Sequence, residues 1–446
     1  MKPLVLAGVL IVGLAAPGPA TAAPTSKTDN LALVATFANQ VSDLSVMQRG
    51  GTDMAFDGRY VYAAEQGAKG GVHIIDTAPT RPRRVGFLPC GGIQNDVSVL
   101  RPGLLALGYH NREFSCGNPQ GGITLVDVST PARPRLLGST TAEIPAGNDP
   151  TADGVSGLHT MTVLPGTPYI YASPGGRQMA SKSIQTIVDV SDPRRPKVAA
   201  SFDTGIGCHD VAFDIRPERR LGFCTGPGAT QVWDVEDPLA PKVIGHIVNP
   251  LHSFHHSAAV TPDGKYVVIG TETVANDCVG GPSGGGLFIY DITRPEAPRV
   301  AGHFGAQRGA ENVYTYPTDL TFDELCAPHL FNFIPSTRTL VSGNGSGGLN
   351  VIDWTEPARP REIAHYQPAD RDYFAAYWFG GRIYANGVQA LDVLAAHLDR
   401  PAATPRVSPA TQQLTPLPQA PRLLGAVPRY LCALPMRASS TRPTRR

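Results

Sequence analysis

The sequence predicts an all-β protein, a seven-bladed β-propeller closed by an N-terminal strand. Three observations predict this fold: a short motif that recurs six times, a degenerate seventh copy near residue 392, and a matching apolar segment near the N-terminus. The chain has 446 residues, which is more than one hydrophobic core usually holds, so an array of repeats is expected.

The recurring motif is an apolar segment that ends at an aspartate, a turn of the form x-x-Pro-x-x-Pro, and a second apolar segment. Proline fixes φ and lacks an N–H donor, and aspartate accepts hydrogen bonds from turn amides, so each copy predicts two strands joined by a specified turn. The aspartates recur roughly every 40 to 60 residues, the period of four-stranded propeller blades with loop insertions. The six copies are GVHIIDTAPTRPRRVG (Asp76), ITLVDVSTPARPRLLG (Asp127), QTIVDVSDPRRPKVAA (Asp189), TQVWDVEDPLAPKVIG (Asp234), LFIYDITRPEAPRVAG (Asp291) and LNVIDWTEPARPREIA (Asp353).

The seventh copy, VQALDVLA around Asp392, lacks the proline turn and the strand that should follow it. The segment LALVATFAN from Leu31 matches RPKVAASFD from Arg195 in its V-A-x-x-F register. We therefore expect the N-terminal strand to complete the seventh blade, because a closed ring hides the edges of its sheets. The expected domains are a signal peptide (1–23), the propeller (31–398) and a Pro- and Arg-rich, flexible C-terminal tail (399–446).

The x-V-x-D-V-S-x-P-x-x-P repeats resemble those of the LVIVD-repeat family, from about Leu31 to Asp392. This resemblance implies a secreted or surface-located β-propeller. The sequence is more distantly similar to the selenium-binding proteins, which include methanethiol oxidases, propellers associated with copper and thiol oxidation. No catalytic motif of that group matches this chain residue by residue, so no site residue is transferred from it.

The N-terminus has the layout of a secretory signal peptide: one basic residue, a short apolar run from Leu4 to about Leu14, a Gly/Pro break and small residues around Ala22. We expect a secreted, extracellular protein with no membrane span. The formal net charge is +1, which disfavours nucleic acid as a partner. A small-molecule substrate or an extracellular protein or glycan is the expected partner, and a monomer is the expected state.

The long insertions should lie on one face of the ring. Strand direction alternates within a blade, so the loops from second to third strands and from fourth to next first strands share a face. The long segments after Tyr109, Ser139, Ala172, Glu272 and His303 all belong to these two classes of loop. Long loops gathered at one end of a rigid scaffold are where binding and chemistry usually occur.

A histidine column is expected at that face. Aligned by their apolar alternation, the innermost strands begin TDMAF, NDVSV, HTMTV, HDVAF, HSAAV, HLFNF and AAYWF. Histidine accounts for 12 of 446 residues, so agreement at one position in four consecutive repeats is improbable by chance. The seven first positions are Thr52, Asn95, His159, His209, His256, His329 and, by this alignment, Ala375.

Imidazoles that converge on the axis can ligate a transition metal at about 2.0–2.1 Å, and ligands from one arc leave the remaining side open for substrate. We expect such an ion at His159, His209, His256 and His329, copper in preference to iron or zinc. The alternative is that duplication copied a histidine that caps the strand or stacks in a ring.

Further polar residues are expected near this face, to orient the imidazoles or to line the entrance. Strand alternation favours an orientation of His255 away from its neighbour His256. Each of these residues has the alternative of a solvated loop end. The candidates are Asp53, Glu65, Asn95, Asp96, Tyr109, His110, Asp210, His255 and Glu272.

Seven cysteines in an exported chain predict disulfides and one leftover thiol. Topology pairs Cys208 with Cys224 across a hairpin, Cys90 with Cys116, and Cys278 with Cys326, and it leaves Cys432 in the tail. The alternative makes Cys208 a soft metal ligand beside His209, which would favour copper.

Two functions follow from these features. The first is a copper- or iron-dependent oxidase of a small substrate, with the catalytic residues other than the metal ligands unknown. The second is a non-catalytic extracellular binding module that uses the loop-rich face. The fold serves both roles, so it does not decide between them.

Overall fold

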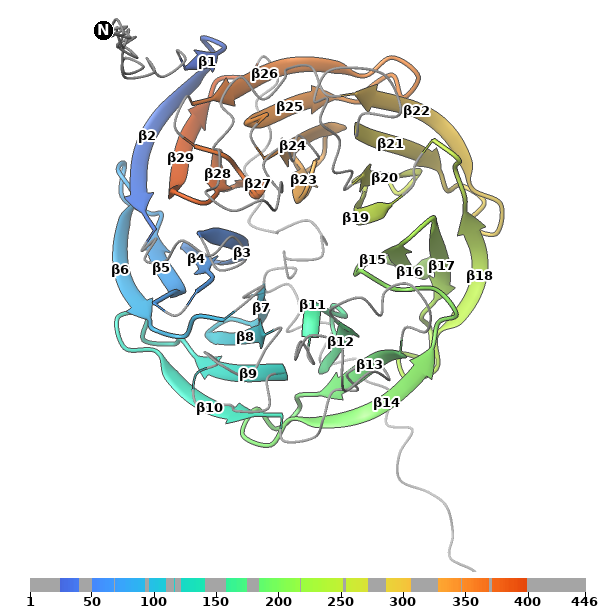
Figure 1. The fold of residues 1–446 in the computed structure, drawn as a ribbon, viewed down its shortest axis with the longest axis horizontal. Coiled ribbons are helices and arrows are strands. Elements are labelled where there is room, and N and C mark those ends of the chain that lie inside the picture. Colours follow the sequence, from blue (N-terminus) through green and yellow to red (C-terminus); the bar gives the residue numbers. More distant parts are fainter. Residues whose placement is uncertain are drawn as a thin grey trace, which may run out of the picture.

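The computed structural model describes residues 25–39, 50–67, 69–92, 96–109, 116, 122–140, 158–174, 184–216, 218–251, 254–271, 286–305, 328–345, 347–368 and 371–398. These residues form seven antiparallel sheets arranged around a central axis (Figure 1). No helix occurs in the described ranges. The predicted seven-bladed β-propeller is confirmed.

Within each blade the strands follow one another outward from the axis, so the innermost strands surround the centre (Figure 1). These are β3, β7, β11, β15, β19, β23 and β27. Blades 1 to 4 consist of β3 (Gly51–Asp57), β4 (Tyr60–Glu65), β5 (Gly71–Asp76) and β6 (Arg83–Leu88); β7 (Asp96–Arg101), β8 (Leu104–Tyr109), β9 (Gly122–Asp127) and β10 (Arg135–Ser139); β11 (Leu158–Val163), β12 (Tyr169–Pro174), β13 (Ile184–Asp189) and β14 (Lys197–Asp203); β15 (Asp210–Arg216), β16 (Arg219–Gly226), β17 (Ala229–Asp234) and β18 (Lys242–Ile247). Blades 5 to 7 consist of β19 (His255–Val260), β20 (Tyr266–Thr271), β21 (Gly286–Asp291) and β22 (Arg299–Gly305); β23 (Phe331–Phe333), β24 (Thr339–Gly343), β25 (Leu349–Asp353) and β26 (Arg361–Gln367); β27 (Ala375–Phe379), β28 (Arg382–Asn386) and β29 (Ala390–Ala396), with β2 (Leu31–Ala38) as the outermost strand.

The N-terminal strand closes the ring as predicted. β2 pairs antiparallel with β29 from Leu31 opposite Ala396 to Ala38 opposite Ala390. The chain also adds β1 (Ser26–Lys27) to the outer edge of blade 6, where Ser26 faces Gln367. The N-terminal segment therefore joins two neighbouring blades, and the second of these contacts had no signal in the repeats.

The turn aspartates perform the role that the repeat predicts. In each of the six motif copies, one carboxylate oxygen accepts the backbone N–H two residues further on; the distances include 3.1 Å from Ala78 to Asp76 and 2.9 Å from Ser129 to Asp127. Arg135 adds an ion pair to Asp127 from the next strand. Each proline turn is thus held by its own aspartate.

Asp392 differs from these turn aspartates. Where the third strand of a blade pairs with the fourth, a β-bulge lies just before the turn aspartate. In blade 7 the corresponding bulge lies between Leu33 and Ala35 of β2, opposite Val393 and Leu394 of β29. This register places Ala395 at the turn position and leaves Asp392 buried inside the sheet. The assignment of Asp392 as the seventh copy of the turn aspartate is therefore wrong, because apolar alternation alone does not fix the strand register.

Asp392 instead holds the closing strand in place. Its carboxylate accepts hydrogen bonds from the Thr36 hydroxyl of β2 (2.6 Å), from the Tyr373 hydroxyl (2.6 Å) and from Arg371 Nη1 (2.7 Å). A buried carboxylate is stable only when its oxygens are paired in this way. These bonds join β2 to blade 7 beyond the backbone ladder.

The hydrophobic core lies between adjacent blades. Trp233 and Tyr171, from blades 4 and 3, are fully buried, with their ring centroids 6.3 Å apart. The Tyr171 hydroxyl donates to the carbonyl of Pro238 at 2.7 Å, so an aromatic ring with a polar tip spans the blade boundary. Burial of side chains between the sheets fixes the angle from one blade to the next.

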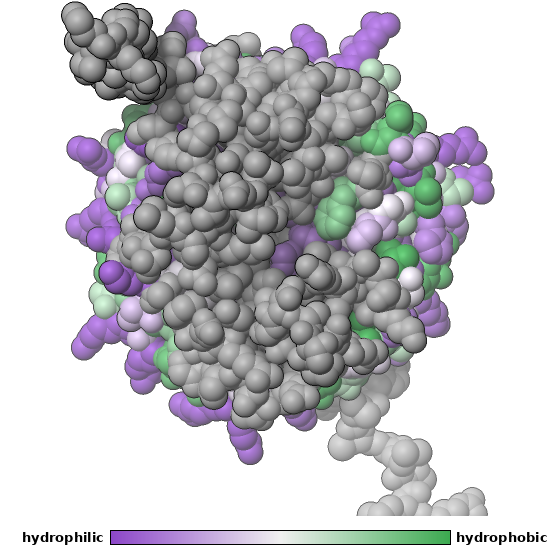
Figure 2. Space-filling view, viewed as in Figure 1, coloured by the Kyte–Doolittle hydropathy of each residue, from purple (hydrophilic) through white to green (hydrophobic). Residues whose placement is uncertain are grey.

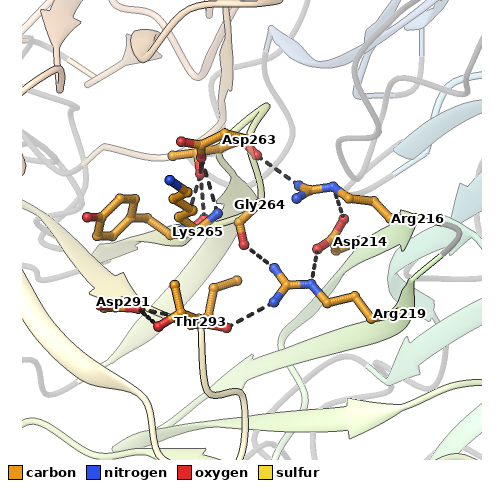
Figure 3. A network of polar contacts seen from close by, with 11 residues as sticks. Asp214, Arg216, Arg219, Asp263, Gly264, Lys265, Asp291 and Thr293 are labelled. Carbon is orange, nitrogen blue, oxygen red and sulfur yellow. Dashed lines mark hydrogen bonds and ion pairs between the residues drawn. The ribbon is translucent and has the colours of Figure 1, made fainter.

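Arginine side chains connect neighbouring blades by ion pairs and hydrogen bonds at the face with short turns (Figure 3). Arg216 and Arg219 of blade 4 both pair with Asp214, each at 3.0 Å. Arg219 also donates to the carbonyl oxygens of Gly264 and of Ile292 (3.0 Å), both in blade 5. Guanidinium groups satisfy several acceptors at once, so this network keeps the two blades in fixed orientation at the end opposite the histidines.

Candidate functional site

The four predicted histidines occupy one structurally equivalent position. In each of these four blades, the residue two positions after the histidine pairs with a residue of the second strand. The pairs are Met161 with Ala172, Val211 with Cys224, Ala258 with Ile269, and Phe331 with Ser342. Thr52 holds this position in blade 1, since Met54 pairs with Ala63. The strand registers therefore support the histidine column.

Blade 7 departs from the predicted alignment by one residue. Ala376 pairs with Ala385, so Phe374 holds the position of the histidines and Ala375 follows it. The backbone N–H of Phe374 bonds to Asn386, as that of His209 bonds to Thr225. Assignment of Ala375 to the column is wrong, and a phenyl ring stands beside the imidazoles in its place.

The imidazoles form a continuous row. The Nε2 atoms of His159 and His209 lie 2.7 Å apart. The ring centroids are separated by 4.3 Å from His159 to His209, by 4.3 Å from His209 to His256, and by 3.9 Å from His256 to His329. The Phe374 ring ends the row at 3.6 Å from His329.

Hydroxyl groups fix the backbone beneath this row. Thr160 donates to the carbonyl of His209 at 2.7 Å, and Ser257 donates to the carbonyl of His329 at 2.5 Å. Each of these hydroxyls belongs to the blade that precedes its acceptor, so the bonds run from blade to blade around the axis. The row is therefore set by the ring closure and does not depend on any single loop.

The row borders a small cavity of about 20 Å³ near the axis. A water molecule needs about 10–15 Å³ of such space, so the cavity has room for one water-sized group. Figure 2 shows the face hollowed near its centre, with hydrophilic surface at the bottom of the hollow. The lining residues are Thr52, Asp53, Asp96, His159, Thr160, His209, Asp210, His256, His329, Leu330 and Phe374.

The site favours the neutral form of two of its imidazoles. Burial holds the pKa of His209 well below its usual range, and the neighbouring imidazoles of His159, His256 and His329 lower it further. Burial and the neighbouring imidazoles lower the pKa of His329 in the same way. A neutral imidazole offers a lone pair to a metal ion, whereas a protonated imidazole does not.

The row is not a finished metal site in this side-chain arrangement. Within the described ranges, no group of three or more His, Cys, Asp and Glu side chains is placed to hold a metal ion. His256 directs its Nδ1 to the carbonyl oxygen of His329 at 3.1 Å. The contact between His159 and His209 brings two ring nitrogens within 2.7 Å of each other.

Three of the predicted polar neighbours, Asp53, Asp96 and Asp210, line the cavity with the histidines. Each carboxylate accepts the backbone N–H of the next residue, at 2.7, 2.8 and 2.9 Å respectively. The same local geometry recurs because each of the three residues directly follows the position of the histidine column in its own blade.

Three other candidates lie elsewhere. Glu65 contacts Nε2 of His73 at 2.8 Å inside blade 1. The Tyr109 hydroxyl donates to the sulfur of Cys116 at 3.1 Å, and His255 contacts the hydroxyl of Thr230 at 2.7 Å. These three side chains are therefore placed in the sheets rather than at the cavity, and His255 has the orientation that alternation predicts.

The remaining candidates and the long loops lie outside the described residues. These are Asn95, His110, Glu272, the cysteines Cys278, Cys326 and Cys432, and most of the insertions that follow Tyr109, Ser139, Ala172 and His303.

Two predicted disulfides are confirmed. Cys90 bonds to Cys116 with Cα atoms 4.8 Å apart, and Cys208 bonds to Cys224 with Cα atoms 5.2 Å apart. Both separations are normal for a disulfide. The sulfur of Cys208 is thus committed to Cys224, and its alternative role as a metal ligand is wrong for this state of the protein.

A comparison with known protein families identifies the repeat. The LVIVD repeat matches residues 118–142 and 185–204, which include the third strands and proline turns of blades 2 and 3. The protein is a seven-bladed β-propeller that contains LVIVD repeats. No curated protein matches the chain. In the described parts of this LVIVD-repeat protein, no helix is long and apolar enough to cross a membrane.

Proposed function

We propose that this LVIVD-repeat propeller is an exported metalloenzyme in which His159, His209, His256 and His329 hold a transition metal ion, copper in preference to iron or zinc, for the oxidation of a small substrate. The observation that carries this proposal is the approach of the His159 and His209 Nε2 atoms to 2.7 Å.

This separation suits two ligands of one ion. Two imidazole nitrogens that bind a metal at about 2.0–2.1 Å, with an angle near 90–110° between them, lie about 2.9–3.4 Å apart. A shift of a few tenths of an ångström would bring His159 and His209 into that range. His256 and His329 follow in the same row and would complete the set by rotation of their side chains.

The surroundings also favour a cation. His209 and His256 are buried, and the lowered pKa values of His209 and His329 favour the neutral imidazole, which is the form that binds metal. Carboxylates at Asp96 and Asp210 line the same cavity and supply negative charge. Charge interactions are stronger in a site that excludes water, so this carboxylate charge would add to the affinity of the ligands.

The arc without histidines gives the site its open side. Thr52 and Phe374 border the cavity there and carry no strong metal ligand. A coordination position that the protein leaves open is where a substrate or water binds in catalytic sites. Imidazole ligands suit copper, which also ranks highest among divalent metals in affinity for such donors. Dioxygen is the electron acceptor that would balance the oxidation.

The disulfides support the export that the N-terminal sequence predicts. Cys90–Cys116 and Cys208–Cys224 are bonds that form and persist in oxidising compartments. An extracellular location would also expose the site to dioxygen and to small extracellular substrates.

Elemental analysis tests the proposal. Purified wild-type protein reconstituted with copper, iron or zinc should retain about one equivalent of copper, and the double variant His209→Ala, His256→Ala should retain none. His246→Ala, which removes an exposed histidine of β18, is the matched control and should retain the wild-type amount. A wild-type protein that retains no metal from any of the three solutions would overturn the metalloenzyme.

The second candidate is a non-catalytic binding module for an extracellular protein or glycan. It is favoured by the finding that no three potential ligands are already placed for a metal in the described residues. Copper that binds without accepting electrons from a thiol or another small reductant would support this candidate over the oxidase.

A further inference from the structure

Two carboxyl groups lie side by side at the histidine cavity. Asp53 of β3 and Asp96 of β7 both line it, on the arc that carries no histidine. Their side chains are almost fully buried, at 3% and 4% exposure. The two carboxyl groups are close enough to share a hydrogen bond across the boundary between blades 1 and 2.

A hydrogen bond between two carboxyl groups requires a proton on one of them, because an ionised carboxylate only accepts. The hydrogen bonds around the pair identify which carboxyl group holds the proton. Both oxygens of Asp96 accept backbone N–H groups, from Val97 at 2.8 Å and from Met161 at 2.6 Å. Asp96 is therefore the ionised carboxylate, and Asp53 carries the proton and donates the hydrogen bond to Asp96.

The electrostatics agree with this assignment. Burial raises the pKa of Asp53 well above its usual range, and the charge of Asp96 raises it further. The hydroxyl of Tyr377 donates to Asp53 at 2.8 Å, and burial near the carboxylates raises the pKa of Tyr377, which keeps that hydroxyl neutral. While no cation is bound, two buried carboxyl groups at this range share one proton, since the repulsion between two buried negative charges disfavours ionisation of both.

The other titratable groups around the cavity are Asp210 from β15 and the four imidazoles. Burial lowers the pKa of His209 and of His329, which favours their neutral form. The proton of Asp53 is thus held next to the space that a ligand of the histidines would occupy.

We propose that Asp53 and Asp96 are the proton donor pair of the histidine site. Asp53 passes its proton to a basic oxygen atom of a ligand bound beside the imidazoles, or to solvent water when a cation binds alone, so the O–H bond on Asp53 breaks and one forms on the acceptor. The positive charge of a bound cation stabilises the two carboxylates that remain, and the proton returns when the ligand leaves. This inference rests on the proposed function, because the ligand must bind at the histidines.

The proton itself is tested in metal-free protein by infrared spectroscopy at pH 7. The spectrum of wild type minus that of Asp53→Asn should contain the C=O band of one protonated carboxyl group, with its shift in D₂O. A difference spectrum that shows only an ionised carboxylate would overturn the pair.

The donor role is tested by counting protons during copper binding. Titration calorimetry with Cu²⁺ in buffers of different ionisation enthalpy should show wild type releasing about one proton more than Asp53→Asn. Asp372→Asn, which changes a buried carboxyl group that does not line the cavity, is the matched control and should release the wild-type number.

The outcomes separate the two proposals. Equal proton release from wild type and Asp53→Asn, with copper bound to both, would overturn the donor pair and leave the metal site standing. A wild-type protein that binds no copper would overturn the proposed function, and the donor role with it, whatever the infrared spectrum shows.

Discussion

The Nε2 atoms of His159 and His209 lie 2.7 Å apart, although the two residues are 50 positions apart in the chain. They belong to the innermost strands of neighbouring blades, and their backbones are tied by the hydrogen bond from Thr160 to the His209 carbonyl. The propeller thus converts a residue repeated once per blade into a group of adjacent side chains. Predictions about the site and the ring follow from this arrangement.

The first prediction concerns the contribution of one ligand. His159→Gln should weaken Cu²⁺ binding by more than about 10-fold, since loss even of a group that only supports a ligand costs about 10–100-fold. A competition titration against a chelator of known affinity measures this change. His255→Gln, outside the cavity, should change the affinity by less than about threefold. Equal losses in both variants would contradict the assignment of the ligands.

The second prediction concerns Cys208 and Cys224. The double variant Cys208→Ser, Cys224→Ser should lower the free energy of unfolding by about 3 kcal/mol, as expected for a bond that closes a loop of this length. It should keep the copper content of wild type, because the Cys208 sulfur is committed to the disulfide. Loss of copper in a variant that remains folded by circular dichroism would restore Cys208 as a ligand.

The third prediction concerns the bonds that hold the closing strand. Asp392→Asn should lower the free energy of unfolding by about 3 kcal/mol, because it leaves the partners of a buried carboxylate poorly satisfied. Thr36→Val removes one of these bonds and should cost about 1 kcal/mol. Urea denaturation followed by tryptophan fluorescence measures both. A smaller effect for Asp392→Asn than for Thr36→Val would contradict the described role.

The fourth prediction concerns ring closure. Deletion of residues 31–38 removes β2 and leaves β29 with an exposed edge, which is a template for pairing with other chains. This variant should form oligomers or aggregates in size-exclusion chromatography with light scattering. Deletion of Ser26 and Lys27 alone, which removes β1 from blade 6, should leave the elution unchanged.

The fifth prediction concerns acid stability at a proline turn. Hydrogen bonds from Ser129, followed by the bond to Arg135, lower the pKa of Asp127 to about 2. The unfolded-state pKa is about 3.9, so the stabilisation by ionised Asp127 is complete above about pH 5 and is lost as the pH falls toward 2. The stability gap between wild type and Asp127→Asn should therefore shrink over this range. Urea denaturation at a series of pH values measures the gap, and a constant gap would contradict the prediction.

The repeats made most of the fold predictable. The aspartate and proline positions specify a strand, a turn and a second strand in each copy, and the hydrogen bonds from Ala78 to Asp76 and from Thr355 to Asp353 confirm this reading. Asp392 was the exception, because the last strand is buried on both faces and lacks the proline turn, so its sequence does not mark the register. Only the pairing with β2 settles that choice.

The histidine column was predictable for a related reason. Repeats place equivalent residues at equivalent heights, and an alignment is sufficient to find them wherever the strand registers agree. The aligned blade 7 strand was one residue out of register, and so Phe374 was missed although it packs on His329. The link between Asp53 and Asp96 was also missed, because each residue by itself is typical of a strand that begins at a polar loop.

The sequence by itself determined the all-β class, the number of blades, the closing N-terminal strand and the equivalence of the four histidines, because each is a local pattern repeated along the chain. The tertiary structure alone decided which side chains meet: the 2.7 Å approach of His159 to His209, the meeting of Asp53 and Asp96 at one cavity, and the pairing of Glu65 with His73 rather than with the cavity. The physical reason is that the first two contacts cross blade boundaries, so their distances depend on the rotation from blade to blade, which the packing between sheets sets. The third contact lies between adjacent strands of one sheet, and it depends on the register of those strands.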